Sequence, residues 1–276
     1  MKKYTTSLIL IILLSLTTNA QNKFDELWTQ AEKLEVDGLS KSALEIVEKI
    51  YTQATETNTP PQIIKSLFYK SKFVLILEEE AQLKVIENFK SQIAKSSFPT
   101  KNVLQNILAN LYWQYFNQNR YQFYNRTKTD TSSSSALKND DFRTWDLDTL
   151  FQEIQTYFKA SLEEEHQLQE IEIEKFSEIL NLQKTTKTFS PTLFDFLANN
   201  ALTFYKTSEN SITKPAYQFQ IDSPDFLKDA DTFSNISMQS KDSLSLQLNA
   251  LKIYQKLVCF HITNGTKNAL ANIDIE

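Results

Sequence analysis

The chain has 276 residues, of which 41% are hydrophobic, and a formal net charge of −5 at pH 7. Its only two glycines, Gly38 and Gly265, nearly exclude dinucleotide-binding and P-loop folds, which need glycines close to phosphate. The acidic balance argues against nucleic acid or an anionic lipid surface as a partner, and the single cysteine, Cys259, allows no internal disulfide.

Residues 1–20 have the pattern of a secretory signal peptide. Two lysines precede an apolar run from Leu8 to Leu16, and Thr18-Asn19-Ala20 supplies a small-residue cleavage site. The run is too short for a convincing membrane span, and an uncleaved anchor is the alternative. We therefore expect an exported protein of the periplasm, the cell envelope or the medium, with no stable membrane span after signal removal.

Residues 21–126 are predicted to form helical hairpins. Apolar residues at helical spacing predict one helix from Phe24 to Gly38 and a second over 40–55. Because the connection is only two or three residues long, these helices must be antiparallel. A further pair follows, with one helix opened by Pro60 and the other over 82–95. Hairpins recurring at about 37 residues indicate a tetratricopeptide-like array.

The helix predicted over Lys101–Arg126 carries two apolar faces. A surface helix needs only one, so a helix with two must be packed between neighbours. We take it as the central helix. One face consists of Leu104, Ile107, Leu108, Leu111, Tyr112 and Tyr115, and the other of Ala109, Trp113 and Phe116, followed by Arg120.

Residues 127–141 are rich in serine and threonine and are predicted to be a flexible loop. The C-terminal part, 142–276, is expected to continue the same helical body. Two of its predicted helices have an N-cap in the sequence: 146–165 is capped by Asp146, and 244–263 is capped by Asp242 or Ser243. Between them, one helix is predicted over 170–182 and another begins at Ser190 and Pro191. Residues 207–241, interrupted by prolines, are predicted to be an irregular arm. The alternation within 266–276 suggests a further element, and hence a longer protein.

The sequence contains no motif for catalysis, a cofactor or a metal. Glu163 and His166 have the spacing of a carboxylate-bridged di-iron helix, but His261 offers no second copy, so we interpret 163–166 as an exposed charge run. Cys259 is interpreted as a small buried hydrophobe. Hydrolase motifs such as G-x-S-x-G and H-E-x-x-H are missing from the sequence. We expect no enzymatic activity; an envelope hydrolase is the weaker alternative.

The C-terminal end of the central helix is the candidate for partner binding. Most aromatic residues of this helix fall on its apolar stripes and are interpreted as core. The tail beyond the stripes adjoins the predicted loop, and tyrosine and arginine are common interface anchors. The candidate partner-binding residues are Tyr115, Arg120, Tyr121, Tyr124 and Arg126.

Four stretches resemble the N-terminal helical region of the large alpha-2-macroglobulin-like proteins exported by Bacteroidetes. They are LANLYWQYFNQNRYQFYNRT at 108–127, DFRTWDLDTL at 141–150, SPTLFDFLANNAL at 190–202 and SKDSLSLQLNALKIYQKL at 240–257. The resemblance implies a cell-envelope or secreted protein whose protease-trapping macroglobulin domains, bait region and any thioester lie beyond this region. It carries over no catalytic residue.

Together these observations predict an all-α protein of stacked antiparallel hairpins. Its expected function is that of the N-terminal interaction and positioning module of an alpha-2-macroglobulin-like protease-trapping protein, without a cofactor. The expected partner is another protein or the downstream macroglobulin domains of the same polypeptide, and not nucleic acid. The alternative is a stand-alone periplasmic tetratricopeptide-like adaptor that binds a protein or peptide.

Overall fold

The computed structural model describes residues 23–79, 81–126, 141–209 and 211–275. These residues are all-helical and contain no strand, as predicted; one isolated bridge joins Glu172 to Thr192. The chain forms two compact units, the first ending at Phe89 and the second beginning at Lys90. The predicted signal peptide and nearly all of the predicted loop over 127–141 lie outside the described residues.

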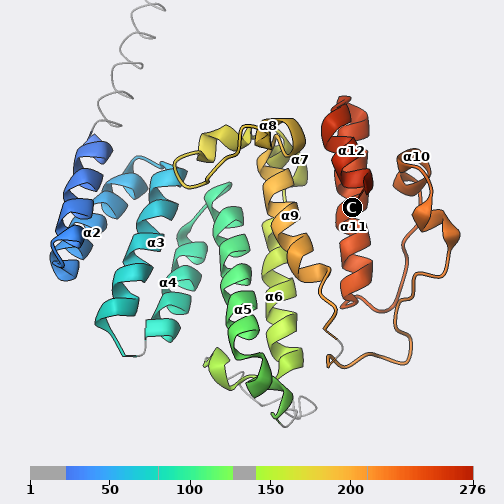
Figure 1. The fold of residues 1–276 in the computed structure, drawn as a ribbon, viewed down its shortest axis with the longest axis horizontal. Coiled ribbons are helices and arrows are strands. Elements are labelled where there is room, and N and C mark those ends of the chain that lie inside the picture. The colour runs from blue at the N-terminus through green and yellow to red at the C-terminus, as the bar shows by residue number, and fades with distance from the viewer. Residues whose placement is uncertain (1–22, 80, 127–140, 210, 276) are drawn as a thin grey trace, which may run out of the picture. The chain divides into compact units, whose positions relative to one another are not determined.

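The first unit consists of antiparallel helices joined by short turns (Figure 1). A helix over residues 23–36 is followed by α2 (Ser40–Glu56) and α3 (Pro60–Leu77), and α4 (Ala81–Lys95) begins in this unit. Gly38 has a φ of 76°, and the Leu39 amide donates to the Leu34 carbonyl at 2.8 Å. The glycine therefore ends the first helix in the left-handed conformation, as its position predicts.

The core of the first unit includes a buried polar contact. The indole Nε1 of Trp28 donates to Oε1 of Gln62 at 2.7 Å, so the buried N–H has a partner. The apolar residues around it are Phe24, Ala31, Ala43, Ile46, Val47, Ile50, Ala54, Ile63 and Phe73.

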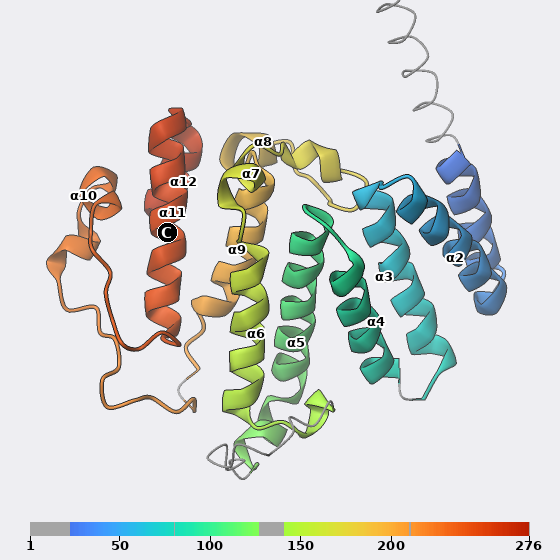
Figure 2. The same cartoon turned by 180° about the vertical axis from the view of Figure 1, so that it is seen from behind.

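In the second unit, α5 (Thr100–Tyr124) contacts both α6 (Leu147–Ser161) and α9 (Leu193–Tyr205). Both views show these three helices side by side (Figure 1, Figure 2). Leu104 and Tyr112 from one predicted face and Ala109 and Phe116 from the other are all buried. The two apolar faces thus reflect a helix enclosed by neighbours.

α5 is interrupted near its C-terminal end. Asn119 has non-helical backbone angles, φ −117° and ψ 18°, and its side-chain amide donates to the Tyr115 carbonyl at 2.9 Å. The interruption changes the direction in which residues 120–124 project. Phe123 is consequently buried, whereas Tyr121 and Tyr124 are exposed.

A polar contact fixes the three helices to one another. Asn106 is 1% exposed, and its amide nitrogen lies 3.0 Å from the Leu197 carbonyl of α9 and 3.2 Å from the Ser161 hydroxyl of α6. Its amide oxygen accepts from Asn200 at 3.0 Å. Because every one of these bonds forms only in one register, Asn106 specifies how the helices align.

The start of α9 differs from the prediction. Its N-cap is Thr192 and not Ser190, because Thr192 and Asp195 form a reciprocal capping box. The Asp195 amide donates to the Thr192 hydroxyl at 3.3 Å, and the Thr192 amide donates to the Asp195 carboxylate at 2.9 Å. Ser190 and Pro191 therefore lie before the helix.

α11 (Leu246–Asn264) begins at a different cap from the one predicted, but it ends where predicted. Ser245 caps it, with its hydroxyl accepting from the Leu248 amide at 3.2 Å. Asp242 does not cap the helix, because its carboxylate accepts from the Phe219 amide of the arm at 3.0 Å. The helix ends as predicted at Gly265, whose φ is 65°.

The remaining elements are short. The helix predicted over 170–182 is not formed; this range contains only the short 3-10 helix η2 and turns, and it lies between α7 and α8. The predicted arm over 207–241 is irregular up to residue 223 in its described part and then contains η3 and α10. The bounds are η1 Phe142–Thr144, α7 Glu165–Gln169, η2 Ile173–Phe176, α8 Thr186–Phe189, η3 Pro224–Leu227, α10 Ala230–Ser234 and α12 Lys267–Ile275. No helix in the described ranges is both long and apolar enough to cross a membrane.

Candidate functional site

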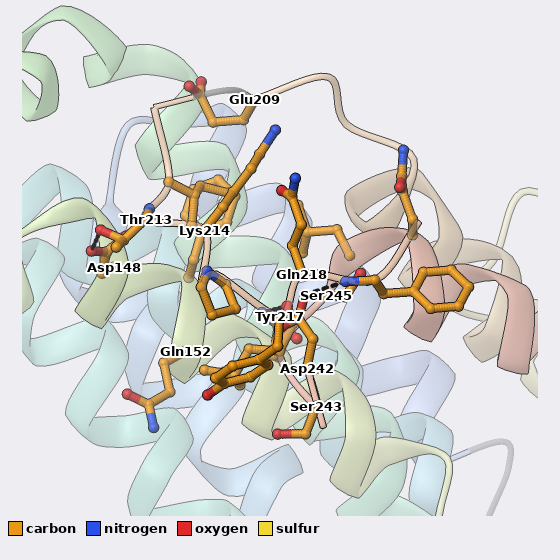
Figure 3. A pocket seen from close by; sticks show the side chains of 18 of the residues that line it. Asp148, Gln152, Glu209, Thr213, Lys214, Tyr217, Gln218, Asp242, Ser243 and Ser245 are labelled. Atoms are coloured by element: carbon orange, nitrogen blue, oxygen red, sulfur yellow. Dashed lines mark hydrogen bonds between the residues drawn. The ribbon is translucent and has the colours of Figure 1, made fainter. Parts of the chain in front are cut away.

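A cleft of about 570 Å³ lies in the second unit (Figure 3). Its walls are the N-terminal half of α6, the parts of the arm over 207–209 and 212–219, and the segment 241–247 that leads into α11. Cavities of about 300–1,000 Å³ are typical of ligand sites in proteins. The cleft is therefore large enough for a small molecule or for part of a peptide.

Carboxylates of the cleft hold the arm in position. Asp148 of α6 accepts from the Thr213 amide at 2.9 Å and also bonds the Thr213 hydroxyl. Asp242 accepts from the Phe219 amide at 3.0 Å. These bonds satisfy backbone donors of a segment that has no helix to satisfy them. The arm is thus pinned at two points along the cleft.

A third carboxylate links the arm to the end of α5. Glu209, whose side chain is 4% exposed, lies 3.9 Å from Arg120 and accepts from the Tyr124 hydroxyl at 2.7 Å and the Ser211 amide at 2.8 Å. Burial by itself would raise the pKa of Glu209, but the hydrogen bonds from Ser211 and Tyr124 and the charge of Arg120 outweigh it, so the pKa lies below its usual value.

The lowered pKa of Glu209 predicts a pH-dependent contribution to stability. Because the folded pKa is depressed, the contribution is fully present above the unfolded value of about 4.3 and is lost as the pH falls through the folded value. The difference in free energy of unfolding between wild type and Glu209→Gln should therefore shrink as the pH is lowered from neutral. Urea unfolding at a series of pH values measures it. If this difference in free energy of unfolding did not change with pH, the lowered pKa of Glu209 would be contradicted.

Other side chains of the cleft remain available to a ligand. Lys214, Lys241, Gln152 and Gln218 line it, and within the described part of the chain their side chains form no ion pair or hydrogen bond. Tyr217 is 60% exposed. Figure 3 draws its ring between Gln152 and Ser243, with Lys214 extending from the arm. The cleft therefore offers uncommitted amide groups and cations next to an aromatic ring.

Two predicted partner-binding residues border a neighbouring hollow. Tyr124 and Arg126 line a space of about 130 Å³ that shares Asp148 with the cleft. The guanidinium of Arg126 donates to the Trp145 carbonyl at 2.6 Å. This hollow and the cleft therefore lie next to each other at the start of α6.

The other three predicted partner-binding residues have different surroundings. Arg120 lies beside Glu209 and supports it. Tyr121 is 84% exposed and meets the ring of Tyr124 edge-on. Tyr115 packs edge-on against Phe142 at a centroid distance of 4.8 Å, so it contributes to packing and not to the hollow.

The cleft residues themselves were not among the sequence candidates. Asp148 and Thr213 meet although they are 65 positions apart, and no local pattern predicts such a contact. Lys214 and Tyr217 appear in the sequence only as parts of an irregular segment near prolines. The sole signal in the sequence is the prediction of an irregular arm over 207–241.

The two histidines have opposite environments. His166 is exposed within the charge run, as predicted, and no group of metal-ligating residues occurs in the described ranges. His261 is fully buried, with Nε2 2.8 Å from Asp195 and Nδ1 2.6 Å from the Thr266 hydroxyl. Because a carboxylate only accepts, Nε2 donates the hydrogen of the bond to Asp195. The network joins α9 to α11.

The prediction that Cys259 is buried is wrong. The residue is exposed on α11, and its sulfur lies 3.7 Å from the Ser234 carbonyl. Partial burial, with a smaller effect of the Glu165 charge, raises the pKa of the thiol. A raised pKa disfavours the reactive thiolate.

The described lining of the cleft contains no histidine or cysteine, and its carboxylates are committed to backbone amides. The arrangement suits reversible binding through hydrogen bonds, charge and aromatic contact. Comparison of the chain with models of protein families, with curated proteins and with solved structures finds no match.

Proposed function

We propose that this protein is a non-enzymatic binding module that holds an extended polypeptide segment of a protein partner in the cleft. The observation that carries the proposal is the contrast between two sets of polar groups that line the cleft. One set, the carboxylates, is committed to holding the arm. The other set, two lysines and the amides of Gln152, Gln218 and Gln247, has no side-chain hydrogen bond or ion pair among the described residues, whereas the fourth glutamine of the lining, Gln155, bonds Leu244 and Asn249.

Glutamine side chains suit a peptide ligand. A peptide backbone in extended form presents N–H donors and C=O acceptors, and a glutamine amide can satisfy both. Gln152, Gln218 and Gln247 line the cleft from three segments, and in the described structure none has a side-chain hydrogen bond. Tyr217 and Leu244, 60% and 53% exposed, add the apolar contact area that usually anchors an interface.

The sequence supports an envelope context for this module. The signal-like pattern of residues 1–20 favours export, and the four stretches described above favour the N-terminal region of an alpha-2-macroglobulin-like protein. In that context the cleft would hold either another envelope protein or a downstream segment of the same polypeptide. The proposed role is to position the trapping domains.

The second candidate is a stand-alone tetratricopeptide-like adaptor. It is favoured by successive helices that pack against each other, α2 with α3 in the first unit and α5 with α6 in the second. Stacked helix pairs create extended surfaces for peptides. Both candidates require the same cleft to bind a polypeptide.

Binding of peptides selected against the protein tests this function. Peptides from a random display library would be selected on the wild-type protein and titrated by fluorescence anisotropy. Tyr217→Ala is expected to weaken binding about tenfold, because interface tyrosines commonly contribute more than 1 kcal/mol. Tyr121→Ala removes another exposed tyrosine, outside the cleft, and should have little effect. A larger effect of Tyr121→Ala, or failure to select any peptide, would overturn the proposal.

A further inference from the structure

The charges around the cleft point to the chemistry of its ligand. We infer that the bound segment is acidic and that its carboxylates pair with Lys214 and Lys241. This inference rests on the proposed polypeptide-binding function and specifies the class of peptide. Both lysines line the cleft, one from the arm and one from the segment before α11.

The carboxylates of the cleft already accept hydrogen bonds from the protein itself. Asp148 and Asp242 accept backbone N–H groups of the arm at 2.9 and 3.0 Å, and Glu209 accepts from Tyr124 and Ser211. A basic ligand would have to compete with these internal donors. Its binding would loosen the arm that forms one wall.

The two lysines of the cleft, by contrast, form no ion pair among the described residues. The ammonium groups of Lys214 and Lys241 have no partner among the residues that the structure describes. Both residues are exposed, so pairing with a carboxylate costs little desolvation. An acidic segment therefore gains contacts without breaking any, whereas a basic one breaks existing bonds. Specificity arises from both effects.

Nucleic acid is a poorer fit to the same lysines. A nucleic acid carries a phosphate at every residue, and its backbone would bring further negative charge close to Asp148, Glu209 and Asp242. The whole chain also has a net charge of −5. A peptide with spaced carboxylates brings fewer negative charges close to these residues.

A pair of matched peptides tests the inference. One peptide, chosen by selection on the wild-type protein, would be synthesised with Asp at its acidic positions, and its twin with Asn at the same positions. Both would be labelled and titrated against wild type and the Lys214→Gln, Lys241→Gln double variant. The control is Lys159→Gln with Lys252→Gln, which removes equal charge from exposed lysines outside the cleft.

The inference predicts that the Asp peptide binds wild type about three to tenfold more tightly than its Asn twin. The cleft double variant should abolish this preference, and added salt should reduce it, while the control variant retains it. If both peptides bind equally and the cleft variant changes nothing, the acidic preference is wrong although the binding function stands. If selection yields no peptide, the function itself fails. A single-stranded oligonucleotide that displaces the Asp peptide through the same lysines would also overturn the inference.

Discussion

Replacing His261 by alanine is expected to lower the free energy of unfolding by about 3–5 kcal/mol. The imidazole is fully buried and bonds Asp195 at 2.8 Å and Thr266 at 2.6 Å. Removing it leaves the Asp195 carboxylate, which is 1% exposed, without one of its partners. The cost of the lost buried hydrogen bond adds to the cost of the cavity left by the ring.

His166 provides the matched control for this prediction. It is exposed in the charge run that opens α7, so His166→Ala should change the free energy of unfolding by no more than about 0.5 kcal/mol. Urea unfolding followed by far-ultraviolet circular dichroism measures both variants. A loss below about 1 kcal/mol for His261→Ala would show that the buried network contributes little.

Replacing Phe204 by alanine is expected to destabilise the protein by about 3–5 kcal/mol. The side chain has no exposed surface. Its ring centroid lies 5.2 Å from that of Trp113, 5.2 Å from that of Phe151 and 5.6 Å from that of Phe158. The large cost follows because three rings lose contacts around a cavity that rigid helices do not close.

Phe189 is the control for Phe204. It is 40% exposed in the short helix α8, so its truncation removes less buried area and should cost about 1 kcal/mol or less. Thermal or urea unfolding would compare the two variants with wild type. Equal losses would contradict the assignment of Phe204 to the centre of the packed cluster.

Local patterns predicted the helices well. The two apolar faces of α5 indicated that it is enclosed by neighbours, because periodicity depends only on residues close in sequence. Gly38 and Gly265 marked helix ends for the same reason. The helix starts were less predictable. Ser190 and Thr192 are both suitable caps, and the choice of Thr192 depends on the capping box with Asp195.

The candidate site was only partly predictable. The sequence directed attention to the end of α5, where Tyr124 and Arg126 border the hollow beside the cleft. It did not identify Lys214 or Tyr217, because the cleft forms only when the irregular arm is pinned to α6. The buried partner of His261 was missed likewise, since Asp195 lies 66 positions away.

The most direct test of the binding site uses a photo-crosslinking benzophenone amino acid. It would replace Tyr217 in the cleft in one protein and Tyr121 at the end of α5 in another, since both positions are exposed. After irradiation with a labelled peptide selected on the wild-type protein, mass spectrometry would locate the crosslinks. We expect efficient crosslinking from position 217 and little from position 121. Crosslinking only from position 121, or equally from both, would contradict binding in the cleft.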